Sequence, residues 1–155
     1  MLRLVVLENS LFFRLGIKEV FKGKPDICVA GDANINAALL GLLAYTPTDV
    51  VLIGVDTPND TIYVNVTHHI RRNYPQIKIL AIANEGTAHI VQSMIKAGIN
   101  GFIGKRQANR YELEIATRKI AGGGQYIGKI DSNNYPITHN KRKINLFTKI
   151  LSNFI

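Results

Sequence analysis

The sequence predicts an α/β domain built on a doubly wound, five-stranded parallel sheet. Two observations support this prediction. Five short apolar runs of strand length alternate with amphipathic segments of helical periodicity, which is typical of a parallel sheet covered by helices. The chain of 155 residues, 46% hydrophobic and 19% charged, is also long enough for one domain with a substantial core.

The predicted strands and helices follow one another in five pairs. The apolar runs predict strands at Leu4–Leu7, Ile27–Ala30, Asp49–Val55, Ile77–Ala83 and Gly101–Gly104. The helical patterns predict helices at Leu11–Phe21, Asn34–Ala44, Ile62–Asn73, Thr87–Ala97 and Arg110–Ala121. Five such pairs fit a flavodoxin-like sheet, in which the functional site lies at the carboxyl ends of the strands.

Apolar spacing and breaking residues justify each helix in order. The first has apolar residues at helical spacing before the stop signal of residues 22–25, namely Phe13, Ile17, Val20 and Phe21. The second can be capped by Asn34 or Asp32, and its expected apolar face is Ala37, Leu40 and Ala44. The third places Val66 and Ile70 inward and ends before Pro75. Gly98 is expected to end the fourth helix, and residues 122–124 the fifth.

Several function classes are disfavoured by what the sequence lacks. No glycine-rich phosphate-binding motif follows a predicted strand, and His68, His69 and His89 have no metal-site spacing. The single cysteine, Cys28, has no partner within the chain and is expected to be a buried small apolar residue. With no signal peptide and no membrane-length apolar run, we expect a soluble, cytoplasmic protein without membrane association.

Several segments resemble, in order, the receiver domains of NarL/FixJ-type response regulators in two-component systems. Arg3–Ile17 joins a hydrophobic strand through an acidic position to a Phe-Arg-x-Gly helix, and residues 48–58 have the pattern of a receiver's third strand and following loop. The match continues through Pro25–Ile27, Tyr74–Leu80, Ala97–Lys105 and Ile120–Ile127. The resemblance covers about residues 1–127 and implies a CheY-like receiver fold.

The resemblance implies five working positions: two acids that hold a magnesium ion, a phosphoacceptor aspartate, a hydroxyl residue and a lysine. In this sequence they are Glu8, Asn9, Gly54, Ala83 and Lys105, and only Lys105 keeps its family type. Phe102 stands where an aromatic residue usually moves with the hydroxyl residue. Because glycine has no side-chain oxygen, Gly54 can neither accept a phosphoryl group nor bind a metal ion. We therefore expect no catalysis, no metal and no cofactor.

Three alternatives concern the altered site. Asp56 is a substitute phosphoacceptor in principle, but Pro58 sets the register with Gly54 at the acceptor position, so we expect Asp56 to be a solvated loop carboxylate. Glu8 and Lys105 are expected to pair across the strand ends. A small anionic or metabolite ligand in the vacated pocket, with Lys105 as its partner, stays open.

The last 28 residues are more basic than the rest of the chain. Residues 128–155 hold 5 basic and 1 acidic residue (+4), against 14 basic and 10 acidic in residues 1–127 (+4), and together these give the net charge of +8. Lys141, Arg142 and Lys143 are candidate nucleic-acid contacts. Residues 137–155 faintly resemble the start of a LuxR-type helix-turn-helix domain, and 141–155 can form an amphipathic helix. Because the sequence stops before a recognition helix, we do not expect sequence-specific DNA binding by this chain alone.

The sequence therefore predicts a receiver-like domain at 1–127, followed by a basic linker and amphipathic segment at 128–155. We expect it to act in signal transduction or transcription regulation without phosphorylation, as a homodimer or bound to a protein partner. The family resemblance places the contact surface on the fourth and fifth helices with the strand between them, where the candidates are Ile95, Phe102, Arg110 and Arg118. The alternative is a DNA-binding regulator that uses its basic tail or a partner's DNA-binding domain.

Overall fold

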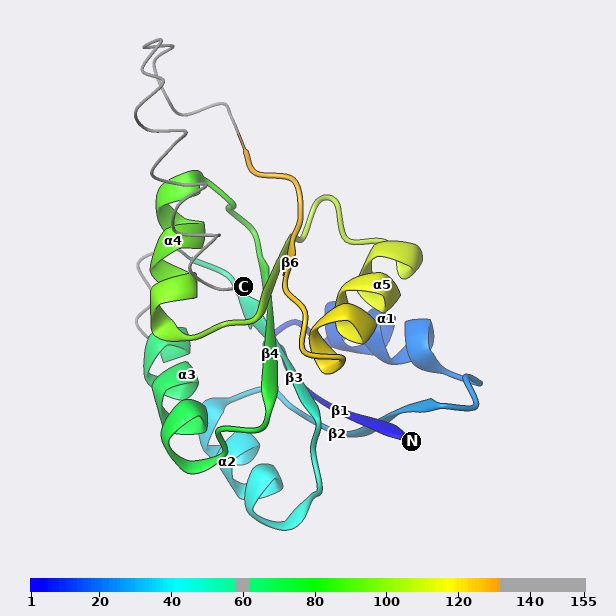
Figure 1. Ribbon diagram of the computed structural model, residues 1–155. Helices are drawn as coiled ribbons and strands as arrows, with labels where there is room; N and C mark the ends of the chain where they lie inside the picture. The colour runs from blue at the N-terminus through cyan, green and yellow to red at the C-terminus, as the bar shows by residue number, and fades with distance from the viewer. Residues whose placement is uncertain (58–61, 132–155) are drawn as a thin grey trace, which may run out of the picture.

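The computed structural model describes residues 1–57 and 62–131, which form one sheet with helices on both faces (Figure 1). The strands are β1 (Leu2–Leu7), β2 (Ile27–Ala33), β3 (Val50–Val55), β4 (Lys78–Ala83), β5 (Gly101–Gly104) and β6 (Tyr126–Ile127). The helices are α1 (Leu11–Phe21), α2 (Asn36–Tyr45), α3 (Ile62–Asn73), α4 (Ala88–Ala97) and α5 (Arg110–Ala121).

The strand order is β2-β1-β3-β4-β5-β6, and every neighbouring pair is parallel. The order runs outward in both directions from β1, so the crossover helices lie on both faces of the sheet. This confirms the predicted doubly wound fold. The described part of the chain adds a sixth strand, β6, which is only two residues long and was not predicted, since so short a strand has no detectable periodicity.

Alternating residues of the central strands feed two hydrophobic clusters, one on each face of the sheet. Val5 and Val51 belong to the cluster covered by α2, α3 and α4, whereas their neighbours Leu4 and Leu52 belong to the cluster covered by α1 and α5. The buried faces of α1 and α3 confirm the expected ones: α1 contributes Ile17 and Phe21, and α3 contributes Val66 and Ile70.

The predictions for β2 needed correction. It runs three residues further than expected, because a bulge at Ala30 shifts the register, after which the strand still pairs with β1 up to Ala33. Asp32 is therefore a strand residue and not a helix cap. Cys28 is half-buried instead of fully buried, because β2 is an edge strand with a neighbour on one side only.

The predicted start and face of α2 were also wrong. The helix begins at Asn36 with Ile35 as its N-cap, which provides no side-chain cap bond. Its buried residues are Leu39 and Leu43, whereas the expected Ala37 and Ala44 are exposed. Most residues of α2 are apolar, so spacing alone could not identify the face that packs on the sheet.

Capping residues set the ends of α4 and α5, the helices before and after β5. Thr87 and Asn109 are the N-caps of α4 and α5, and each side-chain oxygen accepts a hydrogen bond from a backbone N–H in the first turn. Gly98 ends α4 with φ of 115°, a left-handed conformation that favours glycine. The C-cap of α5 is Gly122, as predicted.

Arg71, at the end of α3, joins three elements through its half-buried guanidinium. It donates to the carbonyl oxygens of Gly98 (2.7 Å) and Ile77 (2.8 Å) and to Oδ1 of Asn100 (2.6 Å). Burial lowers the pKa of Arg71. These bonds tie α3 to the end of α4 and to the segments that lead into β4 and β5. None of the helices within the described ranges is long and apolar enough to span a membrane.

Candidate functional site

The carboxyl ends of β1, β3, β4 and β5 bring four of the predicted site positions together. The parallel register pairs Val55 with Ala83 and Ala83 with Gly104, one residue before Lys105. Glu8 directly follows β1, and its backbone N–H donates to Ala33 O. The topology thus brings Glu8, Gly54, Ala83 and Lys105 to the carboxyl ends of the strands, where a doubly wound sheet is expected to carry its site.

The Glu8 carboxylate fills the space that a side chain at residue 54 would need. A Cβ at residue 54 would clash with Glu8 Oε2 and lie 2.7 Å from Glu8 Cδ. Glu8 is only 1% exposed, and its Oε1 accepts hydrogen bonds from the Ser10 N–H (2.9 Å) and from Lys105 Nζ (3.2 Å). A glycine at position 54 is therefore a steric requirement of this Glu8 conformation.

Lys105 is the cation of the site. Its Nζ lies 3.0 Å from Glu8 Oε2 and 2.8 Å from Asp56 Oδ1, and it stands 4.7 Å from the centre of the Phe13 ring. Burial alone would lower the pKa of the ammonium, but hydrogen bonds to Asp56 and Glu8 outweigh it and raise the pKa above its usual range. The expected Glu8–Lys105 pair is confirmed, and Lys105 is held charged.

Asp56 is part of this cluster, contrary to the expectation of a merely solvated carboxylate. Its side chain is 42% exposed, yet Oδ1 binds Lys105, and its backbone carbonyl accepts a bond from Asn84 Nδ2 (3.0 Å). Asp56 follows Gly54 by two residues, which places it on the same side of the extended chain. That spacing indicated that Asp56 lies near the site, but its partner Lys105 could be identified only from the structure.

A second ion pair lies against the first. Arg14 of α1 donates from Nη1 to the Glu8 carbonyl oxygen (2.7 Å), and its Nε lies 2.8 Å from Asp32 Oδ2. Lys18 also binds Asp32, and its hydrogen bond, with that of Arg14, lowers the pKa of the carboxyl group. The loop after β1 is thus held from α1 and from β2.

The positions that would form a switch have no polar side-chain group. Ala83 is 1% exposed, and its carbonyl oxygen accepts a hydrogen bond from the Lys105 N–H (2.8 Å). Phe102 is fully buried, and a Cβ at Gly86 would lie 2.6 Å from its Cζ, so the loop after β4 passes directly over the ring. Neither residue has a hydroxyl group that could change partners.

The residues present do not fit the magnesium ion that the resemblance implies. Asn9 offers a neutral amide where the family has a second acid, and Gly54 offers no ligand. The carboxylates of Glu8 and Asp56 are both bonded to the Lys105 ammonium, which supplies the positive charge of this cluster. Magnesium prefers several oxygen ligands in octahedral order, and this arrangement does not provide them.

A cavity of about 470 Å³ lies beside Gly54. Its lining includes Asn9, Asn34, Asp56 and Tyr63. Lys105 is not among the lining residues, because its ammonium points to Glu8 and Asp56. The idea of an anionic ligand held by Lys105 therefore gains no support from this geometry.

The structure separates the four candidate interface residues. Ile95 is 3% exposed and Phe102 is fully buried, so both side chains belong to the core of this chain. Arg110, the first residue of α5, is exposed. Arg118 is also exposed, but its side chain is directed toward Asp26 and is bound there. The interface as a whole stays a prediction, in which Arg110 is the member most available for contact.

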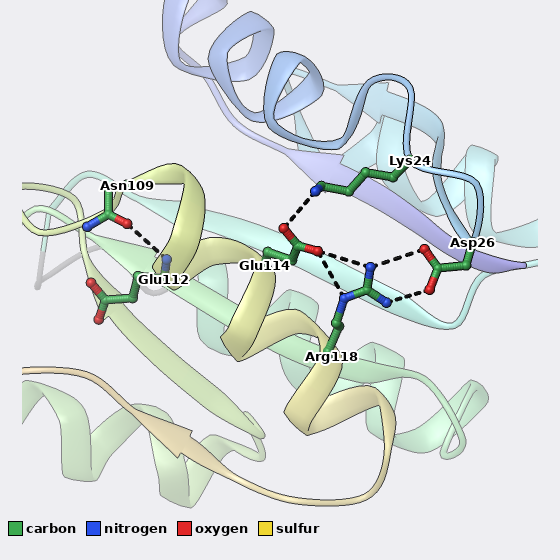
Figure 2. A network of polar contacts seen from close by, with 6 residues as sticks. All are labelled: Lys24, Asp26, Asn109, Glu112, Glu114 and Arg118. Atoms are coloured by element: carbon green, nitrogen blue, oxygen red, sulfur yellow. Dashed lines mark hydrogen bonds and ion pairs between the residues drawn. The ribbon is translucent and has the colours of Figure 1, made fainter.

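Arg118 belongs to a surface network between α5 and the loop before β2 (Figure 2). Its guanidinium donates hydrogen bonds to both carboxylate oxygens of Asp26, at 2.6 and 3.1 Å, and to Glu114 Oε1 at 3.0 Å. Lys24 completes the network with a 2.7 Å contact to Glu114. The hydrogen bond to Asp26, followed by that to Glu114, raises the pKa of Arg118. The candidate nucleic-acid contacts Lys141, Arg142 and Lys143 lie outside the described residues.

One curated relative and several solved structures are similar to this chain. No protein-family model matches the chain. The curated transcriptional regulatory protein DegU of Brevibacillus brevis is 25% identical over 126 residues, or 81% of this chain and 52% of DegU. The chain therefore spans about half the length of this curated relative.

Solved structures agree with the fold. The isolated REC domain of RcsB from Salmonella enterica serovar Typhimurium, in the apo form, superposes with a TM-score of 0.75 at 16% identity, covering 83% of this chain and 94% of that one. A LuxR-family two-component response regulator from Aurantimonas sp. SI85-9A1 superposes with 0.72 at 21% identity, covering 80% and 87%. The Salmonella RcsB bound to promoter P1flhDC gives 0.69 at 17% identity, covering 80% and 61%. The chain thus has the fold of these receiver domains and is similar in sequence to DegU.

Proposed function

We propose that this receiver domain acts without being phosphorylated, as a module held in one state that contacts a second copy or another protein in signal transduction or transcription regulation. It is not an enzyme in this proposal. Its output depends on which proteins it binds and not on a phosphoryl group.

The placement of the Glu8 carboxylate is the observation that carries this proposal. It occupies the space above Gly54 where a receiver needs its phosphoacceptor, and it binds Lys105 there. A phosphoryl group would have to displace a buried, ion-paired carboxylate and would find no nucleophile at residue 54. Displacing Glu8 would break its hydrogen bonds with Ser10 N–H and Lys105 Nζ, so binding a phosphate group here is opposed before any chemistry begins.

The absence of a switch residue supports the same view. In a receiver the hydroxyl residue contacts the bound phosphoryl group and draws the following loop inward. Ala83 has no hydroxyl, and Phe102 is fixed beneath the loop at Gly86. A population shift requires a ligand that binds two states differently, and these side chains offer no such contact.

Phosphoryl incorporation tests the proposal directly. The purified chain is incubated with labelled acetyl phosphate with and without magnesium, beside a receiver that keeps its aspartate. No acid-labile label is expected on this chain. Label that disappears in Asp56→Asn would instead identify Asp56 as a substitute acceptor and contradict the proposal. Label retained in that variant would contradict it too, with the acceptor elsewhere.

Association is the second arm of the test. Sedimentation velocity should show a dimer, or pull-down from the native cell a heterocomplex, that is unchanged by beryllofluoride with magnesium. Arg110→Ala probes the candidate surface, and Arg72→Ala, which changes an exposed residue on α3, is its control. A chain that is strictly monomeric, with no partner retained, would refute a contact function.

DNA binding through the basic tail or a partner's DNA-binding domain is the second candidate. Two observations favour it: the fold is that of RcsB, which has been solved bound to a promoter, and the chain carries a net charge of +8. This proposal predicts steeply salt-dependent DNA retardation that is lost when residues 128–155 are removed. Retardation that is absent at low salt would dismiss binding by the chain itself.

A further inference from the structure

After α5 the chain crosses the open side of β5 and ends, in its described part, at the loop that leads into α4. Figure 1 shows this stretch in orange, running from the end of α5 along the sheet toward the first turn of α4. It consists of Tyr126–Ile127 (β6) and the residues up to Asp131, here named the 126–131 segment. It lies on the face formed by α4, β5 and α5, which the family resemblance identifies as the contact surface.

The backbone of the 126–131 segment satisfies the outer edge of β5. Tyr126 N–H donates to Asn100 O (3.3 Å), and Gly128 N–H donates to Phe102 O (2.8 Å). At its far end, Asp131 N–H donates to Gly86 O (2.9 Å). Because β6 is the last strand of the sheet, lifting it would expose an unpaired row of β5 backbone groups.

Side chains hold the segment at both ends. Tyr126 donates its hydroxyl hydrogen to Glu112 Oε1 on α5 (3.1 Å), and Ile127 and Ile130 pack against the core cluster on the α4 side. The Asp131 carboxylate accepts a bond from the Gly86 N–H (3.0 Å), which adds to the backbone bond between the same two residues. The segment is therefore clamped to the loop between β4 and α4 by a two-bond link.

Two glycines make this close approach possible. A Cβ at Gly128 would lie 3.2 Å from the Phe102 carbonyl oxygen and 3.0 Å from Glu112 Oε1. A Cβ at Gly86 would collide with the Phe102 ring. The loop and the segment thus pack closely over Phe102, with the tighter fit at Gly86 and a smaller steric margin at Gly128.

The geometry points to an autoinhibitory role: the 126–131 segment occupies the α4–β5–α5 face and, when it lifts, exposes the β5 edge to a second copy of this chain. The link between Asp131 and Gly86 couples that release to the loop after β4, the loop that phosphorylation would move in a complete receiver. This inference rests on the proposed function, since it assigns a regulation to the proposed contact surface. The partner is a second copy because an unpaired strand edge pairs with another strand.

A lifted variant tests the inference in the full chain. Gly128→Val and Asp131→Ala together should force the segment off β5 and remove its link to the loop. Glu85→Ala is the matched control, because it removes an exposed carboxylate beside Gly86 that forms no hydrogen bond or ion pair within residues 1–57 and 62–131. Amide hydrogen exchange reports release of the segment, and sedimentation velocity reports association. Circular dichroism verifies that each variant is folded.

In the lifted variant we expect Gly86 N–H to exchange at least about tenfold faster, as the loss of a bond to a charged acceptor predicts, and self-association to strengthen. The control should match the wild type in both. Faster exchange with unchanged association would overturn the inference, since the segment would then inhibit nothing. Unchanged exchange would overturn it as well, since the link would not hold the loop. Either failure is separate from that of the proposed function, which acetyl phosphate labelling and the association of the wild-type chain decide.

Discussion

Replacing Gly54 with alanine tests whether the Glu8 carboxylate occupies the space that a side chain at residue 54 would need. In a strand, alanine is ordinarily better than glycine by about 0.5–1 kcal/mol, because glycine loses more backbone freedom on folding. At this site the new Cβ would meet the Glu8 carboxylate, which would have to leave. The two effects have opposite signs, so the direction of the change in stability is itself informative.

The contacts of Glu8 set the size of the loss. Its displacement breaks the bond from Ser10 N–H and both contacts with Lys105, although Lys105 keeps Asp56 as a partner. A hydrogen bond to a charged group contributes about 1.5–3 kcal/mol. Because Glu8 can regain some hydration outside the site, we expect Gly54→Ala to reduce the free energy of unfolding by about 2–4 kcal/mol.

Urea denaturation followed by far-ultraviolet circular dichroism measures this, in a double-mutant cycle with Glu8→Ala. Once Glu8 is shortened, the alanine at position 54 has room, so the double variant should lose clearly less than the sum of the two single losses. Gly41→Ala, in open space within α2, is the steric control and should not destabilise. A neutral or stabilising Gly54→Ala, or strict additivity with Glu8→Ala, would refute the assignment of this space to Glu8.

Two further predictions concern stability. Arg71→Lys should lower the free energy of unfolding by about 2–3 kcal/mol, because one ammonium replaces a guanidinium that donates to several acceptors in fixed geometry. Arg72→Lys, on the exposed side of α3, should be nearly neutral in the same urea assay. Stability should also depend on pH. Hydrogen bonds from Lys18 and Arg3 lower the folded-state pKa values of Asp32 and Asp49 below 3.8. Their contribution to the free energy of unfolding is therefore present above pH 3.8 and is lost as the pH falls through the folded-state values. The pKa of Lys105 lies above 10.5, so its contribution is present below that pH and is lost as the pH rises through the folded value. Thermal melts across pH should therefore show stability falling at both ends, and Lys105→Met should remove the alkaline decline attributable to this residue.

The fold was predictable because its signals are local. Apolar runs, helical spacing and breakers such as Gly98 report conformation within a few residues, so the order of five strand–helix pairs emerged correctly. The errors occurred where local signals were weak. In α2 nearly every residue is apolar, and spacing could not choose between the exposed Ala37 and the buried Leu39.

One contact of the site was predictable. The Glu8–Lys105 pair follows from two opposite charges at the carboxyl ends of strands in one parallel sheet, although β3 and β4 lie between β1 and β5. That Gly54, Asn9 and Ala83 are departures from a receiver's site stays a prediction from residue type. Asp56 was underestimated because sequence position showed it as a loop residue. Its proximity to Lys105, 49 positions away, exists only once β3 and β5 lie in the same sheet.

By itself, the sequence determined that this chain alternates strands and helices as a receiver does, and that residue 54 has no side-chain oxygen. These are properties of residue type and short-range spacing. Only the tertiary structure decided that the Glu8 carboxylate stands in the space above Gly54, and that the 126–131 segment closes the edge of β5. Both depend on groups that are distant in the chain, such as Glu8 and Lys105 at a separation of 97, and packing alone brings such groups within contact distance.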